Sequence, residues 1–259
     1  MMITFVAENY YEMIGSIHRG RNFTFVAIPL ITLALLALFS SFTPPAPSRI
    51  SMKMESKMLA KGKATVVNAE IYYQYDQGKL MTRYLPPLDY MFFTNNKGEA
   101  KIYYPTSNEV MMRQSAEFNS EKGLLFFFLA NKLSDLGLGE MGFKIMDTKF
   151  EDGLVISTWN PPGELLKLFS KVELVHESYR PIFIAYYDKK GKVLQKIYYY
   201  EYSSFPDFSL PLKVVQTDFM ADGDSSITKI TYSDIKTGDK ANSNFFNFKI
   251  PVNAKVKKQ

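Results

Sequence analysis

The chain of 259 residues contains no cysteine. Disulfides, thiolate metal sites, catalytic thiols and a lipid-modified N-terminal cysteine are therefore excluded from this sequence. Histidine is also scarce, since only His18 and His176 occur, and there is a single tryptophan. The stability of the fold must come from packing.

Catalytic signatures are missing as well: there is no HExxH, GxSxG or Walker A motif. His176, at the end of an expected strand, fits a surface or hydrogen-bonded structural residue better than a general base. The GLGEMG at 137–142 follows an expected helix and precedes a strand, whereas a dinucleotide loop needs the opposite order. Asp222-Gly223-Asp224 has too few carboxylates for a calcium loop and is typical of a turn. We predict that the protein is not an enzyme and that it has no cofactor and no metal site.

The charge is mild and the aromatic content is high. The formal net charge is +5, hydrophobic residues make up 46% of the chain and aromatic residues 15%. Such a charge does not by itself indicate a nucleic-acid partner, and no basic stripe accompanies the tyrosines of residues 197–202. The aromatic enrichment favours half-buried β-strands over helices.

Residues 1–46 are typical of an export leader. Phe23–Phe39 is uncharged and apolar apart from two threonines and one proline, and Arg19 and Arg21 precede it. The segment is long for a signal-peptide core and slightly short for a spanning helix, so both a cleaved signal and a retained anchor are open. In either case the positively charged N-terminal side stays in the cytoplasm, and residues 47–259 are exported to the other side of the membrane.

After a linker and domain start at 47–61, stiffened by nearby prolines, residues 62–259 read as a series of hairpins. In 65–75, for example, Val67, Ile71 and Tyr73 share one face. The pattern predicts roughly ten or eleven antiparallel strands. Candidate segments for these strands, more numerous than the strands expected because some edges are uncertain, are 65–75, 79–85, 88–94, 99–104, 110–113, 143–149, 154–159, 172–176, 182–188, 193–202, 212–219, 227–234 and 245–250.

Two segments are expected to be helical, 121–136 and 163–171. The first contains Leu124–Leu129, six large apolar residues that are too few to cross a bilayer and must be covered by protein. One arrangement is a curled sheet with this helix as a lid over an apolar cavity. The other is a filled β-sandwich whose core the run plugs. The pattern by itself favours the plug and leaves the lid open.

The C-terminal FFNFKIPVNAKV (245–256) resembles the F-x-F-x-x-P-x-x-x-x-V ending of the LolA-type outer-membrane lipoprotein carriers. Residues 97–112, 124–131 and 182–199 are similar to segments of that family in the same order, so the resemblance covers roughly 62–257.

The resemblance implies a mainly β (α+β) domain: one large curved antiparallel sheet, an unclosed half-barrel of about eleven strands with a helical lid. It also implies a periplasmic, monomeric carrier without covalent chemistry. The ligand would be lipoprotein acyl chains or another lipid, taken from an inner-membrane exporter to an outer-membrane acceptor. An alternative with the same fold is a lipid-sensing or glycolipid-export accessory protein tethered to the inner membrane by residues 23–39. Agreement between pattern and resemblance favours the lid.

The expected lid comprises Leu124, Leu125, Phe126, Phe127, Phe128 and Leu129. The expected lining of the lipid-binding cavity comprises Val67, Ile71, Tyr73, Met91, Phe93, Ile102, Tyr104, Met111, Ile156, Ile184, Tyr186 and Phe248. The family has an arginine on its first long strand that holds the lid, and the comparable position here is Tyr75. Either Arg83 replaces that arginine or the lid closes by hydrophobic contact alone.

Overall fold

The computed structural model describes residues 49–220 and 222–257. The leader expected at 1–46, including its apolar stretch at 23–39, lies outside the described residues, so export stays a prediction. Among the helices that the structure describes, none combines the length and the apolar character needed to cross a membrane.

One mixed, unclosed sheet of fourteen strands dominates the described residues. All neighbouring strands are antiparallel except β14 and β6, and β1 joins the two halves by pairing with both β2 and β13. Along the sheet the order is β14-β6-β5-β4-β3-β2-β1-β13-β12-β11-β10-β9-β8-β7. The strands are β1 (Arg49–Ala60), β2 (Lys63–Gln74), β3 (Lys79–Tyr84), β4 (Tyr90–Thr94), β5 (Glu99–Tyr104), β6 (Glu109–Gln114), β7 (Lys144–Glu151), β8 (Leu154–Asn160), β9 (Lys171–Glu177), β10 (Arg180–Tyr187), β11 (Val193–Ser204), β12 (Ser209–Phe219), β13 (Ser225–Thr237) and β14 (Lys255–Val256).

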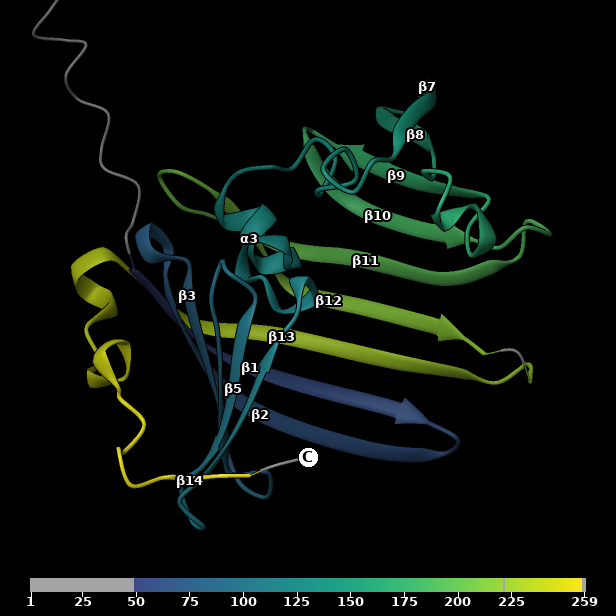
Figure 1. Ribbon diagram of the computed structural model, residues 1–259. Helices are drawn as coiled ribbons and strands as arrows, with labels where there is room; N and C mark the ends of the chain where they lie inside the picture. The colour runs from purple at the N-terminus through teal and green to yellow at the C-terminus, as the bar shows by residue number, and fades with distance from the viewer. Residues whose placement is uncertain (1–48, 221, 258–259) are drawn as a thin grey trace, which may run out of the picture. The chain divides into compact units, whose positions relative to one another are not determined.

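The sheet is strongly curved. Figure 1 shows β2–β6 turning away from the plane of β9–β13, with the short helix α3 (Leu124–Leu129) lying in the bend. We call the face toward α3 the concave face; it carries Ile71, Leu174, Ile184 and Val214, which belong to one buried apolar cluster. We call the opposite face the convex face. The predicted half-barrel architecture is confirmed.

The sequence reading missed β1 and misplaced a strand at the C-terminus. Residues 49–60 fall within the expected linker and domain start at 47–61, where no strand was expected; Lys and Glu, which recur there, are weak strand formers. Ile50, Met52 and Met54 nevertheless alternate onto the concave face, and β1 is a central strand paired along its length on both sides. The strand expected at 245–250 does not exist: a 3₁₀ turn (Asn244–Asn247) and irregular chain occupy those residues.

The expected helix at 121–136 is shorter than predicted. A 3₁₀ turn (Ser120–Lys122) leads into α3, and turns replace the rest. The backbone adopts positive φ at Asn131 (52°) and Leu136 (48°), which no α-helix tolerates. Leu133, Leu136 and Leu138 are buried without helical support. In 163–171 only the 3₁₀ turn Leu165–Lys167 forms. Further 3₁₀ turns are Tyr75–Gln77, Ala116–Phe118 and Gly238–Ala241.

The segment 120–143, which we call the roof, is held on the concave face by both packing and hydrogen bonds. Phe128 packs edge-on against Tyr199, with ring centroids 5.4 Å apart. The Ser120 hydroxyl donates to the Gly78 carbonyl oxygen at 2.5 Å. The His176 Nε2 lies 2.8 Å from the Leu133 carbonyl oxygen and donates to it, because a carbonyl can only accept. The prediction of a hydrogen-bonded structural histidine is confirmed.

Gly137→Ala should loosen the roof. At φ +81° a Cβ is strained, and it would lie 2.2 Å from the Phe127 ring. We expect a loss of about 3 kcal/mol in the free energy of unfolding, measured by chemical denaturation. Gly153→Ala is the matched control, with φ +80° and open space around the Cβ, and should cost only about 1 kcal/mol. Equal losses in the two variants would show that Phe127 does not pack tightly on Gly137.

Candidate functional site

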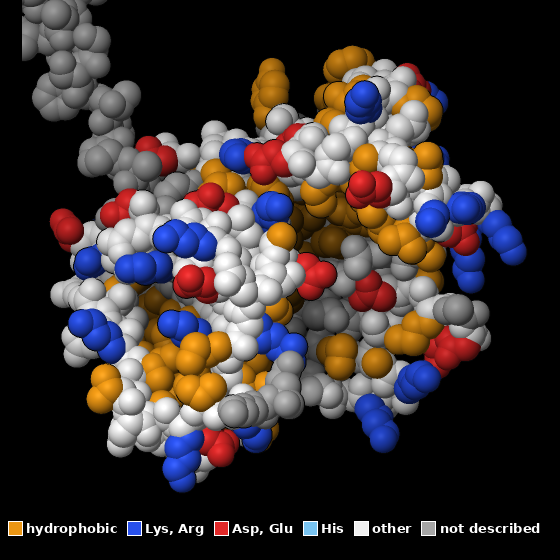
Figure 2. Space-filling view, viewed as in Figure 1, with side chains coloured by type: hydrophobic (Ala, Val, Ile, Leu, Met, Phe, Trp, Pro, Cys, Tyr) orange, Lys and Arg blue, Asp and Glu red, His pale blue; other side chains and the backbone are white. Residues whose placement is uncertain are grey.

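The roof covers only part of the concave face. Beneath it Leu174, Ile184 and Val214 are buried to 3% exposure or less. Further along the same face, Ile197 and Ile230 are only partly buried. Figure 2 shows a hollow whose visible walls are hydrophobic. An apolar surface that the protein itself leaves partly uncovered is the usual form of a site for an apolar ligand.

A pocket of about 830 Å³ opens beside the roof, between its residues Asn131–Ser134 and the concave side chains of Val155 and His176. Its volume lies within the range of about 300–1,000 Å³ that is usual for ligand sites. Phe150 and Tyr179 also line it, and they are 81% and 95% exposed. None of these positions was expected from the sequence, because they meet only through the pairing of β8 with β9 and the path of the roof.

The strand register places most of the predicted lining residues on the concave face. The pairs Ile71–Thr82, Thr82–Phe92, Phe92–Ile102 and Ile102–Met111 carry this face across β2–β6. The predicted residues on it are Val67, Ile71, Tyr73, Ile102, Tyr104, Met111, Ile184 and Tyr186. That these residues contact a lipid remains a prediction.

Met91, Phe93, Ile156 and Phe248 do not lie on the concave face. Met91 and Phe93 form a second cluster on the convex face, where Phe248 stacks on Phe93 at 5.9 Å. Both faces of β4 are apolar because both are covered by other parts of the chain. The alternation of residues along β4 therefore does not indicate which face is concave. Ile156 pairs with Val175 on the convex side of β8, whereas its neighbour Ser157 pairs with the buried Leu174.

The predicted lid residues all meet the buried cluster of the concave face. Phe127, Phe128 and Leu129 are buried in that cluster, and Leu124, Leu125 and Phe126 pack against it while partly exposed. The Lys132 ammonium lies 5.2 Å from the Phe126 ring centroid, which keeps a charge at the outer surface of the roof. The run therefore rests on the apolar wall, and its role as a movable lid stays a proposal.

Tyrosines are frequent on the concave face, and only some of them are among the expected lining residues. Burial raises the pKa of Tyr232 to about 12, and burial followed by neighbouring tyrosines raises the pKa of Tyr199 well above its usual value. Burial likewise raises the pKa of Tyr202, whose hydroxyl donates to the Pro181 carbonyl oxygen. These phenols stay neutral at physiological pH. They offer a ligand flat apolar rings together with a few hydroxyl groups.

A polar cluster lies on the concave face away from α3, toward one end of β11 and β12. The Asp218 carboxylate accepts from Gln195 Nε2 at 2.6 Å and from Gln216 Nε2 at 2.9 Å. The concave face thus runs from an apolar region under the roof to a carboxamide–carboxylate group. Such a surface suits a molecule with an apolar tail and a polar head.

Arg83 does not hold the roof. It lies on the convex face, where its guanidinium binds the Glu70 carboxylate at 3.1 Å and stacks 4.9 Å from the Phe245 ring centroid. The side chain of Tyr75 lies outside the described residues. Polar contacts of Ser120 and His176, and a hydrogen bond from the Asn96 amide to the Glu121 carboxylate, fix the roof instead.

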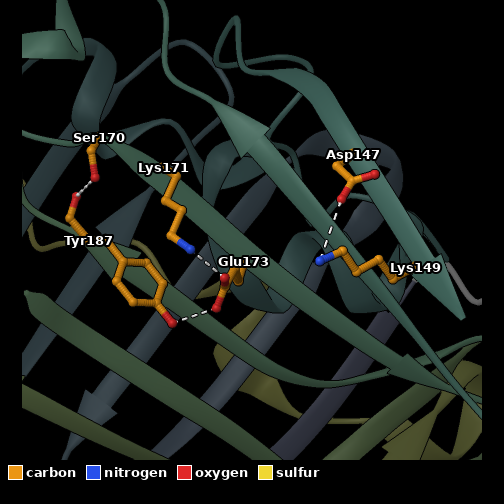
Figure 3. A network of polar contacts seen from close by, with 6 residues as sticks. All are labelled: Asp147, Lys149, Ser170, Lys171, Glu173 and Tyr187. Carbon is orange, nitrogen blue, oxygen red and sulfur yellow. Dashed lines mark hydrogen bonds and ion pairs between the residues drawn. The ribbon is translucent and has the colours of Figure 1, made fainter. Parts of the chain in front are cut away.

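The convex face of β9 and β10 carries charge. Lys171 donates to Glu173 at 2.6 Å, and the Tyr187 hydroxyl donates to the same carboxylate (Figure 3). Burial raises the pKa of Glu173, but the two hydrogen bonds outweigh it and hold the pKa below its usual value. Burial and the Glu173 carboxylate raise the pKa of Tyr187 to about 12. These charged and polar side chains suit a face in contact with solvent, whereas the concave face of the same strands is apolar.

Metal ligands do not gather in this domain: among residues 49–220 and 222–257, no cluster of three or more His, Asp or Glu side chains could hold an ion.

No family profile and no curated protein matches the sequence. Solved structures do match the fold. A LolA superfamily protein from Nitrosomonas europaea aligns with a TM-score of 0.51 and 12% identity over 79% of this chain and 91% of its own. A candidate outer membrane lipoprotein-sorting protein domain from Vibrio parahaemolyticus aligns with a TM-score of 0.52 and 15% identity over 77% and 89%. The chain has a LolA-like fold.

A third structure, a DUF1329 family protein from Desulfovibrio piger, aligns with a TM-score of 0.52 and 14% identity over 83% of this chain and 94% of its own. At such identities the likeness establishes the LolA-like fold alone, and the function must be argued from the concave face.

Glu173→Gln should weaken the LolA-like domain at neutral pH. The folded-state pKa of Glu173 is lowered, so its contribution is present above the unfolded value near 4.5 and is lost as pH falls through the folded pKa. We expect a loss of about 0.5–1 kcal/mol at pH 7 that vanishes in acid, measured by urea denaturation across pH. Glu151→Gln, at an exposed carboxylate of β7, is the control and should change little. A loss that persists unchanged in acid would contradict the assignment.

Proposed function

We propose that the protein is a periplasmic carrier that binds the acyl chains of lipoproteins, or of other lipids, on the concave face and passes them to the outer membrane. The observation that carries the proposal is the apolar concave face, which the roof leaves partly uncovered. The LolA-like fold supports it, as does the likeness to a candidate lipoprotein-sorting domain.

The driving force would be burial of hydrocarbon, worth about 0.8 kcal/mol for each methylene group. Burial of two acyl chains would bind the lipid too tightly for release, so a carrier has to offset part of that binding free energy. The roof offers a means. Phe127 and Phe128 lie on the concave face, and a ligand that binds there must displace them from apolar contacts such as that of Phe128 with Tyr199. Release is then assisted by the return of the roof.

The hydrogen bonds of the roof support this exchange. Ser120 fixes the start of the roof and His176 binds its Leu133 carbonyl oxygen, and α3, which lies between these two attachments, has no side-chain cap at Gly123. In the proposed exchange, α3 would shift while these two attachments stay in place. The exposed aromatic rings of Phe150 and Tyr179 beside the 830 Å³ pocket supply an apolar entry for the chain ends.

The proposed partners are an inner-membrane exporter that delivers the lipid and an outer-membrane acceptor that receives it, with the protein acting as a monomer. If residues 23–39 stay attached, the same concave face would serve a tethered lipid sensor or a glycolipid-export accessory protein. N-terminal sequencing of the exported protein separates the two: a new N-terminus beyond residue 39 supports the carrier, and an intact leader supports the tethered alternative.

Ile230→Gln should reduce lipid binding, because it places an amide on the partly buried concave side of β13. Loss of one apolar contact of about 1–2 kcal/mol predicts a roughly tenfold weaker affinity for a fluorescent fatty acid, measured by titration. Ile227→Gln is the matched control on the same strand, since Ile227 faces the convex side and is 43% exposed. It should bind as the parent does.

Native mass spectrometry of the gently purified protein provides the complementary measurement, because it would detect a co-purified lipid directly. Equal binding by the Ile230→Gln and Ile227→Gln variants, with both folded, would remove the concave face as the lipid site.

A further inference from the structure

A second pocket lies on the convex face, opposite the proposed acyl site. Here residues 243–254 run across the outer side of the β2–β6 half of the sheet and contact its second apolar cluster. Between this segment and the sheet is a pocket of about 370 Å³, which we call the C-terminal pocket. Its lining comprises Tyr72, Gln74, Lys79, Leu80, Met81, Phe93, Thr94, Asn95, Glu99, Lys101, Phe245, Phe246, Phe248, Lys249 and Ile250.

Aromatic rings from the sheet and from the C-terminal segment form one part of the wall of the C-terminal pocket. Tyr72 from the sheet meets Phe245 and Phe246 of the C-terminal segment at centroid distances of 5.1 Å and 5.5 Å. Phe93 and Phe248 stack at 5.9 Å with an interplanar angle of 17°. Met81, only 5% exposed, contributes a polarisable thioether to the lining. These side chains form an apolar slot within the pocket, and the volume of the whole pocket lies within the usual range for small-molecule sites.

Positive charge surrounds this slot. Lys79, Lys101 and Lys249 are exposed side chains of the lining, and within the part of the chain that the structure describes none of them forms an ion pair. The Lys79 ammonium donates to the Gln77 amide oxygen at 2.7 Å. Glu99, the one acidic residue of the lining, accepts from the Asn95 amide at 2.8 Å. Three cations against one carboxylate leave an unbalanced positive rim that favours an anion.

We propose that the C-terminal pocket binds a small amphiphilic anion, with an acyl or aromatic group in the slot and a carboxylate or phosphate against the lysines. An apolar slot alone would accept any hydrophobe, and exposed lysines alone would attract any anion weakly. Their combination selects a molecule that carries both parts, such as a fatty acid or a lysophospholipid. The C-terminal pocket shares no lining residue with the 830 Å³ pocket beside the roof, and its proposed ligand does not depend on the function proposed for the concave face.

Methionine methyl groups can report on the two faces separately. The full-length chain is labelled with ¹³C-methyl methionine, and the signals of Met81 in the pocket and Met54 on the concave face are assigned from Met→Leu variants. Octanoate and octyl phosphate are then titrated. We expect a saturable shift of the Met81 signal with both probes and no shift with inorganic phosphate. Octanol should bind with at least tenfold weaker affinity than octanoate.

The charge requirement is tested with the double variant Lys101→Gln and Lys249→Gln, which should weaken the Met81 response to octanoate about tenfold. Lys229→Gln, an exposed lysine on the convex side of β13, is the control and should leave it unchanged. Any one of four results overturns the proposal: no Met81 shift, a shift with inorganic phosphate alone, equal affinity for octanol, or insensitivity to the double variant. A response at Met54 without one at Met81 supports only the acyl site on the concave face and also overturns this inference.

Discussion

The apolar run Leu124–Leu129 on the concave face is the contact on which the rest of the structure depends. An open sheet of fourteen strands presents a wide apolar face that its own curvature does not close. The roof covers part of that face, and Phe127, Phe128 and Leu129 enter the same cluster as Leu174 and Val214. Burial of the roof stabilises the fold, and the roof leaves part of the apolar concave face uncovered, where the proposed acyl site lies.

In the proposed carrier, the roof and an acyl chain would compete for one surface. Both gain free energy by removing the same hydrocarbon from water, so net affinity is a difference between two similar quantities. Tyrosines suit such a surface, because their rings accept either Phe128 or a lipid tail while burial keeps their hydroxyl groups neutral. Reversible transfer in the proposed carrier would follow from this competition, without a covalent step.

The two faces of the sheet are covered by different parts of the chain. The roof packs on the concave face, and the segment 243–254 packs on the convex face of the β2–β6 half. Arg83 belongs to the second cover, since it bridges Glu70 and Phe245. Beyond that cover, charge networks such as Lys171–Glu173–Tyr187 keep the convex face compatible with water. The chain thus has an apolar cluster on each face of the sheet, and the two clusters have different electrostatic surroundings.

Sequence by itself determined the hairpin pattern, the need to cover Leu124–Leu129 and the structural role of His176, because these follow from local periodicity and side-chain chemistry. It also placed Ile71 and Ile184 on one face. Tertiary structure decided the rest. The central place of β1 depends on pairing with β13, almost the whole domain away in sequence. The face of Phe93 depends on which cover packs there, and the length of α3 depends on positive φ angles at Asn131 and Leu136. The pairing of β1 with β13 and the packing of a cover on Phe93 are long-range contacts that leave no local signal. Alternation shows that residues share a face but not what lies against that face.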